Sequence, residues 1–506
     1  MTHDDAPAPS RRMLRQQTDA GASGIPSGVL TVESDALPPA PLPPASDLSG
    51  GRPPKKAPAA PRVAFGWVDE ASVLSLTRAT PALENSTAPY VPVTADLLSD
   101  APRRSPWRPG VLVPVGIIAL LLGGYSATTL LWPLHSVAPE ITAVAVQPVA
   151  APVTTPAWPA VGSAAVEVAG IDGVTASTTD ADTIASITKV VTALLVLDRM
   201  PLALGEQGPE YAFTGADRTR YWSYRANGES ALDVPVGGTL TQYQLLEGML
   251  IGSANNYADR LAGNLWPNDR VFASAAQSWL ETHGVPGVTI VDPSGIEMGN
   301  VASPEALIPL AERALANPVI AEIVAKQSVE LPGAGLVENT NGLLVDPGVL
   351  GIKTGSLDRY NLLSAKTITV GDTAVRLYAS VLGQPDDATR VEASRALYAQ
   401  LEQELQLRPS VTADTLAGTV KTLWGAKANV LTAADADVIL WNGGVGEVTT
   451  TYALDDSRKA GDTVGSLSVR GPLDSTTVDL RLSDDIDGPS PWWRLTHPLD
   501  LFGLNG

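Results

Sequence analysis

A serine and a lysine three positions apart carry the strongest chemical signal in this sequence. Ser186 and Lys189 lie at the start of a Val- and Leu-rich stretch that predicts a largely buried helix. Residues three apart share one face of a helix, and a buried lysine is costly unless it is used or paired. A lysine whose pKa is lowered by burial can take the proton of a serine. The pair predicts a nucleophile with its own base, although a helix-capping serine and a surface lysine would show the same spacing.

Two further short motifs follow this pair. Ser253-Ala254-Asn255 comes after an apolar run, and Lys353-Thr354-Gly355-Ser356 lies farther along the chain. Lys189 is the only lysine with a serine three positions earlier, and Lys353 is the only one followed by Thr-Gly. The order S-x-x-K, S-x-N, K-T-G matches the motif set of the serine penicillin-recognising enzymes. Each motif alone is weak, but the ordered set strongly favours the catalytic interpretation of Ser186 and Lys189.

Composition argues against several other classes of function. The chain has no cysteine, so disulfides and thiolate metal sites are impossible. Its four histidines lie far apart in sequence, which argues against a histidine-based triad or a zinc cluster. A net charge of −20 argues against nucleic acid as a partner. We therefore expect neither a metal nor another cofactor.

The N-terminal part predicts a membrane anchor. Residues 1–109 are rich in Pro, Ala and Ser without apolar periodicity, which predicts a disordered cytoplasmic tail. Residues 110–132 are uncharged and long enough to cross a bilayer of about 30 Å. Arg103, Arg104 and Arg108 precede this span, so the N-terminus is expected inside and the rest of the chain outside. Residues 133–157, rich in Pro and Ala, predict an extended extracytoplasmic stalk.

Two globular parts are expected after the stalk. The first, residues 158–405, predicts an α/β domain, because helices in its middle lie between strands at both ends. Its expected helices cover 184–197, 241–250, 271–282, 303–316 and 389–405, and its expected strands cover 164–168, 173–177, 348–354, 361–369 and 374–381. The second part, residues 406–506, alternates short β runs with turns and predicts a small sandwich or barrel. Its aromatic C-terminal tail is expected to pack back onto this domain, with a membrane surface or wall polymer as the other option.

The ordered motifs resemble those of the D-alanyl-D-alanine carboxypeptidases, the low-molecular-mass penicillin-binding proteins. The stretch Asp292-Pro293-Ser294-Gly295-Ile296, followed by Asn300, also looks like this family. The resemblance covers about residues 158–402. It implies a transpeptidase/β-lactamase-like fold, in which an antiparallel sheet and a helical lobe enclose the site. It also implies peptidoglycan stem peptides as substrates and β-lactams as covalent inhibitors.

The resemblance implies a role for each motif residue. Ser186 would attack the carbonyl between two terminal D-alanines, with Lys189 as its base. Ser253 would relay a proton to the leaving amine, and Asn255 would bind the peptide backbone of the substrate. Lys353 would lower the pKa of Lys189 and, with Thr354, favour the C-terminal carboxylate of the substrate. Gly355 permits a close backbone approach, and the N–H groups of Ser186 and Ser356 would form the oxyanion hole.

Tyr360 and Asn361 depart from the family pattern, in which an Ala-Gly pair usually follows K-T-G. They are expected to narrow or redirect that end of the site.

A β-lactamase would share the three motifs, but class A enzymes also need a glutamate. No E-x-x-L-N stretch lies between Asn255 and Lys353, so rapid β-lactam hydrolysis is not expected. An endopeptidase that cuts cross-links and a catalytically silent wall or division scaffold are the alternatives to an extracytoplasmic D,D-carboxypeptidase.

Overall fold

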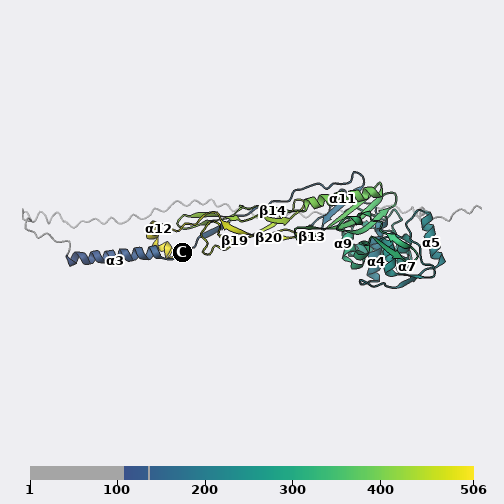
Figure 1. Cartoon of the computed structure of the whole chain (residues 1–506), viewed down its shortest axis with the longest axis horizontal. Coiled ribbons are helices and arrows are strands. Elements are labelled where there is room, and N and C mark those ends of the chain that lie inside the picture. Colours follow the sequence, from purple (N-terminus) through teal and green to yellow (C-terminus); the bar gives the residue numbers. More distant parts are fainter. Residues whose placement is uncertain (1–107, 135–136, 506) are drawn as a thin grey trace, which may run out of the picture. The chain divides into compact units, whose positions relative to one another are not determined.

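The computed structural model describes residues 108–134 and 137–505 (Figure 1). These residues fall into two units, one holding residues 108–124 and the other residues 125–505. The predicted tail over residues 1–109, with Arg103 and Arg104, lies outside the described residues except at its last two positions.

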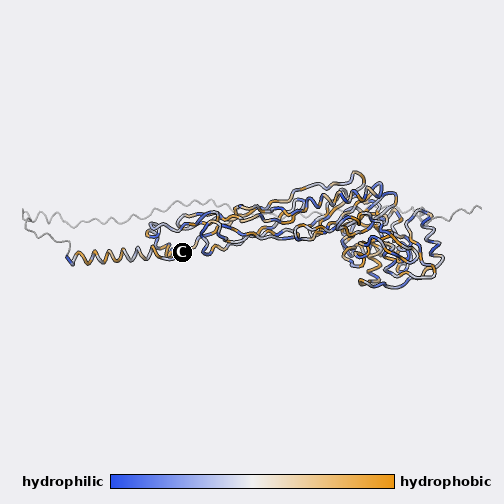
Figure 2. The backbone as a smooth tube through the Cα atoms, in the orientation of Figure 1, coloured by the Kyte–Doolittle hydropathy of each residue, from blue (hydrophilic) through white to orange (hydrophobic). Residues whose placement is uncertain are grey.

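Helix α3 (Pro109–Leu131) coincides with the predicted membrane span to within one residue at each end. Every side chain in it except Thr129 and Ser126 is exposed, and Figure 2 shows apolar residues along its length. By length and composition, α3 is the one helix within residues 108–134 and 137–505 that could cross a membrane. An exposed apolar helix of this kind is costly in water.

An antiparallel five-stranded sheet forms the base of the domain expected over residues 158–405. Its strand order is β11-β12-β13-β2-β3, so the first strands of this region pair with the last. The bounds are β2 (Ser163–Val168), β3 (Thr175–Ala176), β11 (Val349–Ser356), β12 (Tyr360–Val370) and β13 (Thr373–Gln384). The predicted hairpin and the three later strands are all present, each within a few residues of its expected ends. The predicted α/β fold class is confirmed.

Helix α11 (Asp387–Glu404) packs against the sheet through buried Leu397, Tyr398 and Leu401, which share a core with Leu362 and Leu377. A second core holds the residues that face the helical lobe. The sheet is therefore apolar on both faces, which explains why its strands read as nearly continuous apolar runs.

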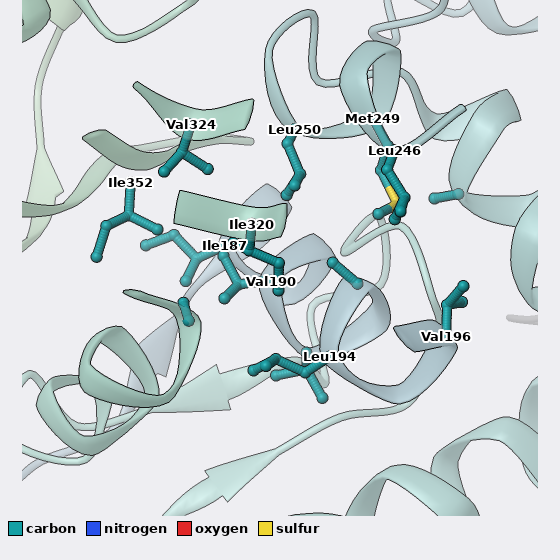
Figure 3. Close-up of a cluster of buried hydrophobic side chains, with 14 of the residues drawn as sticks. Ile187, Val190, Leu194, Val196, Leu246, Met249, Leu250, Ile320, Val324 and Ile352 are labelled. Carbon is teal, nitrogen blue, oxygen red and sulfur yellow. The ribbon is translucent and has the colours of Figure 1, made fainter. Parts of the chain in front are cut away.

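The helical lobe is built around α4 (Thr188–Arg199), of whose 12 residues ten are buried. Figure 3 shows Val190 and Leu194 of α4 within a cluster that includes Leu246, Ile320 and Ile352 from other elements. The surrounding helices are α5 (Gly215–Ala226), α6 (Gln242–Leu250), α7 (Asn255–Leu265), α8 (Asp269–Thr282), α9 (Leu307–Ala316) and α10 (Pro318–Val324). Burial of α4 on all sides fixes the position of Lys189 in its first turn.

Short elements complete the lobe. Helix α6 is capped by Thr241, the first residue of the expected helix, whose hydroxyl accepts from the Gln244 N–H. The expected helix over 303–316 starts later, at Leu307, because Ser303 caps a turn by accepting from the Ala306 N–H. The remaining elements are β4 (Asp182–Thr183), η2 (Ala185–Ile187), β5 (Glu210–Ala212), β6 (Thr239–Thr241), β7 (Val288–Thr289), β8 (Val301–Ala302), β9 (Ser328–Leu331), β10 (Gly335–Glu338) and η3 (Gly342–Val345).

The C-terminal part is β-rich, as predicted. A six-stranded sheet has the order β1-β15-β16-β20-β19-β18, and β14 pairs with β17. The bounds are β14 (Leu407–Val411), β15 (Leu416–Lys421), β16 (Lys427–Thr432), β17 (Ala436–Ile439), β18 (Glu447–Tyr452), β19 (Thr463–Arg470) and β20 (Ser475–Leu482). Strand β14 was not predicted because Pro409 lies within it. Two short helices, α12 (Pro491–Thr496) and α13 (Pro498–Leu501), end the chain.

The expectation of an extended stalk over residues 133–157 is wrong for its middle part. Strand β1 (Glu140–Ala143) lies in that range and pairs antiparallel with β15 at the edge of the six-stranded sheet. Downstream of β1, Val149 N–H donates to the Ser410 carbonyl, and Ile141 and Val146 pack against the β core. A Pro- and Ala-rich composition favours an extended backbone. An extended segment that lies beside an open sheet edge can form hydrogen bonds with it and so become a strand.

This pairing predicts where the chain can be shortened. A chain beginning at residue 155 lacks β1 and the apolar contacts of Ile141 and Val146, whereas one beginning at residue 137 keeps them. We expect the shorter chain to lose roughly 2–4 kcal/mol of unfolding free energy in the β domain, because partly buried aliphatic side chains are removed. Thermal unfolding of the two chains measures this loss. Equal melting temperatures would show that β1 does not stabilise the sheet.

Candidate active site

Ser186 and Lys189 lie at the junction of the 3₁₀ turn η2 and helix α4. Lys189 is fully buried, and its Nζ lies 2.7 Å from Ser186 Oγ. The N-cap of α4 is Ile187 and makes no side-chain capping bond. The alternative of a capping serine with a surface lysine therefore does not describe this pair. Ala185, just before the serine, has φ +49°, a strained conformation of the kind that clusters at functional sites.

The second motif supplies a further contact to the lysine. It occupies the turn between α6 and α7, where Asn255 Oδ1 accepts a hydrogen bond of 2.7 Å from Lys189 Nζ. Ser253 is 5 % exposed and has φ +59°, so the turn holds it in a left-handed conformation that is unfavourable for serine. The turn is fixed from outside because Asn255 N–H donates to the Ser230 carbonyl at 2.9 Å.

The third motif runs along the edge strand β11, beside η2. Lys353 is buried and donates to Thr354 Oγ1 at 3.3 Å, and Thr354 Oγ1 lies 2.6 Å from Thr340 Oγ1. A Cβ at Gly355 would stand 2.4 Å from the Ile184 carbonyl oxygen, so only glycine allows β11 to approach the nucleophile turn this closely. Ser356 follows at the mouth of the cleft.

A third hydrogen-bond partner for Lys189 comes from a loop that the sequence analysis gave no role. The Ser294 carbonyl oxygen accepts from Lys189 Nζ at 2.6 Å. Asp292, 1 % exposed, holds this loop by accepting from the backbone N–H groups of Ser294, Gly295 and Glu297. The sequence analysis noted the Asp-Pro-Ser-Gly stretch. It could not predict that the Ser294 carbonyl contacts Lys189, which lies 105 positions away in the sequence.

Gly295 brings this loop against the nucleophile. It has φ +79°, and a Cβ there would stand 2.0 Å from the Ala185 carbonyl oxygen. The same loop is tied to the nucleophile turn by Asn300, whose carbonyl accepts from the Ile184 N–H and whose side chain donates to Asp292 Oδ2 at 2.6 Å. The loop and the Ser186 turn therefore form one hydrogen-bonded unit.

Arg390 is the second residue that the sequence did not predict. It lies in the first turn of α11, is 4 % exposed and forms an ion pair with Asp387. Its Nη1 donates to the Gly355 carbonyl and to Ser356 Oγ, both at 3.1 Å. An arginine in the first turn of a helix shows no special sequence pattern, and only the fold brings it to the end of the K-T-G strand.

The two departures from the family pattern lie differently from one another. Tyr360 lines the cleft, and the guanidinium of Arg390 lies 5.4 Å from the centre of its ring. Asn361 instead points away from the cleft lining: it donates to the Thr183 carbonyl at 2.9 Å and accepts from the Gly383 N–H at 2.8 Å. Tyr360 therefore lies where it can shape the site, as expected. Asn361 instead connects β12 to β4 and β13.

These elements enclose an open cleft of about 770 Å³. Three segments line it around Ser186 and Asn255: residues 227–230, residues 295–298 and residues 356–360. The lining residues are Ser186, Asn227, Gly228, Glu229, Ser230, Asn255, Gly295, Ile296, Met298, Ser356, Leu357, Asp358 and Tyr360. The space is polar on average and would admit an extended peptide rather than a compact apolar ligand.

Burial dominates the electrostatics of the two lysines. It lowers the pKa of Lys189 to about 7, against the charges of Asp292, Asp259 and Glu229, which raise it. The pKa of Lys353 is lowered well below its ordinary value, first by burial and then by the charges of Lys189 and Arg390. Repulsion between two cations disfavours the charge on both, so the expectation that Lys353 lowers the pKa of Lys189 stays a prediction.

Comparison with known proteins identifies the segment that carries these motifs. Residues 174–385 match the family model described as D-alanyl-D-alanine carboxypeptidase. The matched segment contains all three motifs, from Ser186 to Ser356. The D-alanyl-D-alanine carboxypeptidase DacB2 of Mycobacterium tuberculosis is 31 % identical over 178 residues, which is 34 % of this chain and 57 % of that protein. The chain thus spans little more than half the length of this curated relative.

Solved structures similar to the chain include a DD-transpeptidase and a penicillin binding protein. The Streptomyces K15 DD-transpeptidase is 23 % identical, with a TM-score of 0.42 over 49 % of this chain and 98 % of that one. Penicillin binding protein 5 of Haemophilus influenzae is 17 % identical, with a TM-score of 0.46 over 66 % of this chain and all of that one.

The pKa of Lys189 predicts a pH profile for the activity of the segment that carries the three motifs. A base must be neutral, so kcat/KM should rise with pH and level off above about 7. Glu229 lines the cleft and raises the pKa of Lys189, so Glu229→Gln should move this acid limb to lower pH. Glu281→Gln, on the exposed face of α8, is the control and should leave the profile in place. An acid limb that stays or moves upward in Glu229→Gln would contradict the assignment of Lys189 as the titrating base.

Proposed function

We propose that this chain is an extracytoplasmic serine D,D-carboxypeptidase that removes the terminal D-alanine from peptidoglycan stem peptides through an acyl-enzyme on Ser186. One observation carries the proposal. Lys189 Nζ has three partners, and two of them, Asn255 Oδ1 and the Ser294 carbonyl, can only accept. A neutral amine has two N–H bonds for those two acceptors, which leaves its lone pair directed at Ser186 Oγ–H. The site is built for a lysine that takes the proton of the serine.

The first step is acylation. As Ser186 Oγ attacks the carbonyl carbon of the penultimate D-alanine, its proton passes to Lys189 Nζ over a hydrogen bond of 2.7 Å. The developing oxyanion would be stabilised by the N–H groups of Ser186 and Ser356, which lie on the two sides of the Gly355 contact. The proton then leaves with the amine of the departing D-alanine, with Ser253 as the relay. Hydrolysis of the ester by water returns the free enzyme.

The end of β11 favours a substrate with a free carboxylate. Lys353, Thr354 and Arg390 meet there, and Arg390 already reaches the hydroxyl of Ser356. Burial and the neighbouring cations lower the pKa of Lys353, so a bound carboxylate would restore the charge of its ammonium group. Arg390 is paired with Asp387, so Lys353 is the cation beside Thr354 that a substrate carboxylate would neutralise, which favours a C-terminal residue over the middle of a chain. This favours trimming of free ends over cutting of cross-links.

Turnover of two substrates tests the proposal. Purified protein is incubated with a diacyl-D-Ala-D-Ala peptide and, separately, with a cross-linked muropeptide dimer, with Ser186→Ala as the control. We expect release of D-alanine from the first, slower cleavage of the second and none with the variant. Preferred cleavage of the dimer would establish an endopeptidase instead. No turnover of either substrate together with no labelling by fluorescent penicillin would favour a silent scaffold.

The proposal includes single-pass anchoring by α3 with the N-terminus inside. It is supported by the 23 residues of α3 and by Arg108 immediately before it. Protease added to intact protoplasts should remove the chain after residue 132 and spare the first hundred residues. Digestion of the N-terminal tail in intact protoplasts would reverse the orientation.

A further inference from the structure

A second groove, of about 710 Å³, lies on the helical lobe between α4 and α8. Asp198 and Arg199 of its wall are in the last turn of α4, about 15 Å along the helix from Lys189. Its other wall is the exposed face of α8. No residue that lines this groove also lines the catalytic cleft, so a ligand held here leaves Ser186 open to its substrate.

Aromatic rings form the floor of the groove. Trp266 is 7 % exposed, and Trp279 stacks on His283 with the ring centres 4.1 Å apart. His283 Nδ1 lies 2.8 Å from the Trp279 carbonyl oxygen, which can only accept. Nδ1 therefore carries a proton, and Nε2 of the neutral ring is an acceptor. These contacts hold the rings in place, and the rings offer a ligand an apolar surface with polar edges.

The indole N–H of Trp279 is an unmet donor in this floor. Its Nε1 is buried from water and has no hydrogen-bond partner among the residues that the structure describes. Most buried donors in proteins have a partner, and one without a partner is costly. An oxygen atom of a ligand seated against the floor would supply the missing acceptor after a small turn of the ring.

Two arginines without ion pairs border the groove. Arg199 and Arg270 are both exposed, and neither is paired with a carboxylate within residues 108–134 and 137–505. The acidic residues next to them in the chain are Asp198, which lines the groove, and Asp269, which does not. A guanidinium binds carboxylate or phosphate oxygens through paired N–H groups. Two such arginines beside one hollow, in a chain of net charge −20, favour an anionic ligand.

A row of hydroxyl groups runs along the α8 wall. Ser274, Ser278 and Thr282 line the groove at intervals of four residues, so they lie on one face of the helix over about 12 Å. Thr282 Oγ1 donates to the Ser278 carbonyl at 2.7 Å, and the two serines are exposed. With the carboxylate of Asp198 on the α4 wall, these groups suit a ligand with many hydroxyls, each of which can both donate and accept.

We propose that this groove binds a sugar that carries a negative charge. Its carboxylate or phosphate would meet Arg199 and Arg270, and its ring hydroxyls would meet Asp198 and the serines of α8. An acyl chain needs a more apolar and more enclosed channel, and a peptide strand needs an open sheet edge, which the face of a helix lacks. The recognition is independent of the reaction proposed for Ser186. Only the source of the sugar, a polymer of the cell wall, rests on the extracytoplasmic placement in the proposed function.

Titration with three small sugars tests the groove. The full chain in detergent carries an NMR-active nitrogen isotope in its tryptophan rings, and the indole N–H resonance of Trp279 is identified by its loss in Trp279→Phe. N-acetylmuramic acid and N-acetylglucosamine share one ring structure, and only the first carries a carboxylate, whereas glucose phosphate carries a phosphate. We expect saturable movement of the Trp279 resonance with a charged sugar, and binding of N-acetylglucosamine that is about tenfold weaker or worse.

The two charged probes distinguish the sources of the sugar. Movement with N-acetylmuramic acid alone supports the proposal and identifies muramic acid of the glycan strands as the natural ligand. Movement with glucose phosphate alone supports it equally and identifies a phosphate-linked wall polymer.

Two substitutions and a matched control place the charged group. Arg199→Gln and Arg270→Gln each remove one cation and should weaken binding of the charged sugar about tenfold, because one charge-assisted contact is lost. Arg313→Gln is the control, since Arg313 is also exposed in the last turn of a helix of the same lobe, α9, and does not line the groove. None of the three arginines lines the catalytic cleft, so penicillin labelling of Ser186 should be unchanged in each variant.

The contrary results are distinct from one another. No movement of the Trp279 resonance with any of the three sugars overturns the proposal. Binding that is as tight in Arg199→Gln and Arg270→Gln as in Arg313→Gln, or as tight for N-acetylglucosamine as for the charged sugars, also overturns it, because the anion then has no part in recognition. A chain that binds the charged sugar but is not labelled by penicillin overturns the reaction proposed for Ser186 and leaves the groove intact.

Discussion

Lys189→Arg is expected to abolish acylation of Ser186 by penicillin and release of D-alanine while leaving the chain folded. Arginine keeps the positive charge but does not lose its proton near neutral pH, so no base remains 2.7 Å from Ser186 Oγ. Loss of a general base costs about 10²–10⁴-fold in rate. We expect the upper end, because a serine has little nucleophilicity of its own. The acyl-enzyme is measured by mass spectrometry after timed incubation with penicillin.

Matched variants make this result interpretable. Ser186→Ala should form no adduct at all, since no atom remains to be acylated. Lys353→Arg keeps a cation beside Thr354 and should be milder. Lys326→Arg replaces another lysine of the helical lobe, one paired with Glu247, and should acylate normally. Because Lys189 is buried, Lys189→Met, which has a similar length, is made as well and should be equally inactive. Full acylation of either Lys189 variant would identify another group as the base.

Local patterns predicted most of the catalytic region. The helix around Lys189 could be predicted because its apolar residues are contiguous, and the strands after Gly348 because they are long and buried on both faces. The three motifs could be located because each depends on residues adjacent in sequence. The structure brings Ser186, Lys189, Asn255 and the K-T-G strand together, with Ser253 in the same turn as Asn255.

Contacts between distant segments escaped prediction. Arg390 reaches Gly355 only because α11 packs across the sheet, and Ser294 reaches Lys189 only through a backbone carbonyl. Neither contact could be predicted from the spacing of residues in the sequence. Strand β1 was missed for a related reason: a Pro-rich extended segment becomes a strand only when a sheet edge, here β15, lies beside it. Burial of Lys353, the largest cause of its lowered pKa, could not be judged from residue spacing.

Asp292→Asn is expected to destabilise the fold and impair catalysis together. Oδ1 of Asp292 accepts from two backbone N–H groups and the Ser294 hydroxyl, and Oδ2 accepts from the Glu297 N–H and the Asn300 side chain. An asparagine has one acceptor oxygen, so its NH₂ group must face donors on one side. A buried donor without a partner costs about 1–3 kcal/mol, and we expect roughly 2–4 kcal/mol in unfolding free energy. Thermal and denaturant unfolding measure this loss.

The catalytic effect separates a positioning role from a merely stabilising one. When the loop loosens, the Ser294 carbonyl no longer fixes Lys189 Nζ, so kcat should fall more than KM rises. The charge of Asp292 raises the pKa of Lys189, so its removal should also move the acid limb of kcat/KM to lower pH. Asp346→Asn, which breaks an exposed ion pair with Arg395, is the control and should change stability by only about 0.2–1 kcal/mol. A folded Asp292→Asn enzyme with normal kcat and an unshifted profile would mean that the loop stabilises the domain without positioning its base.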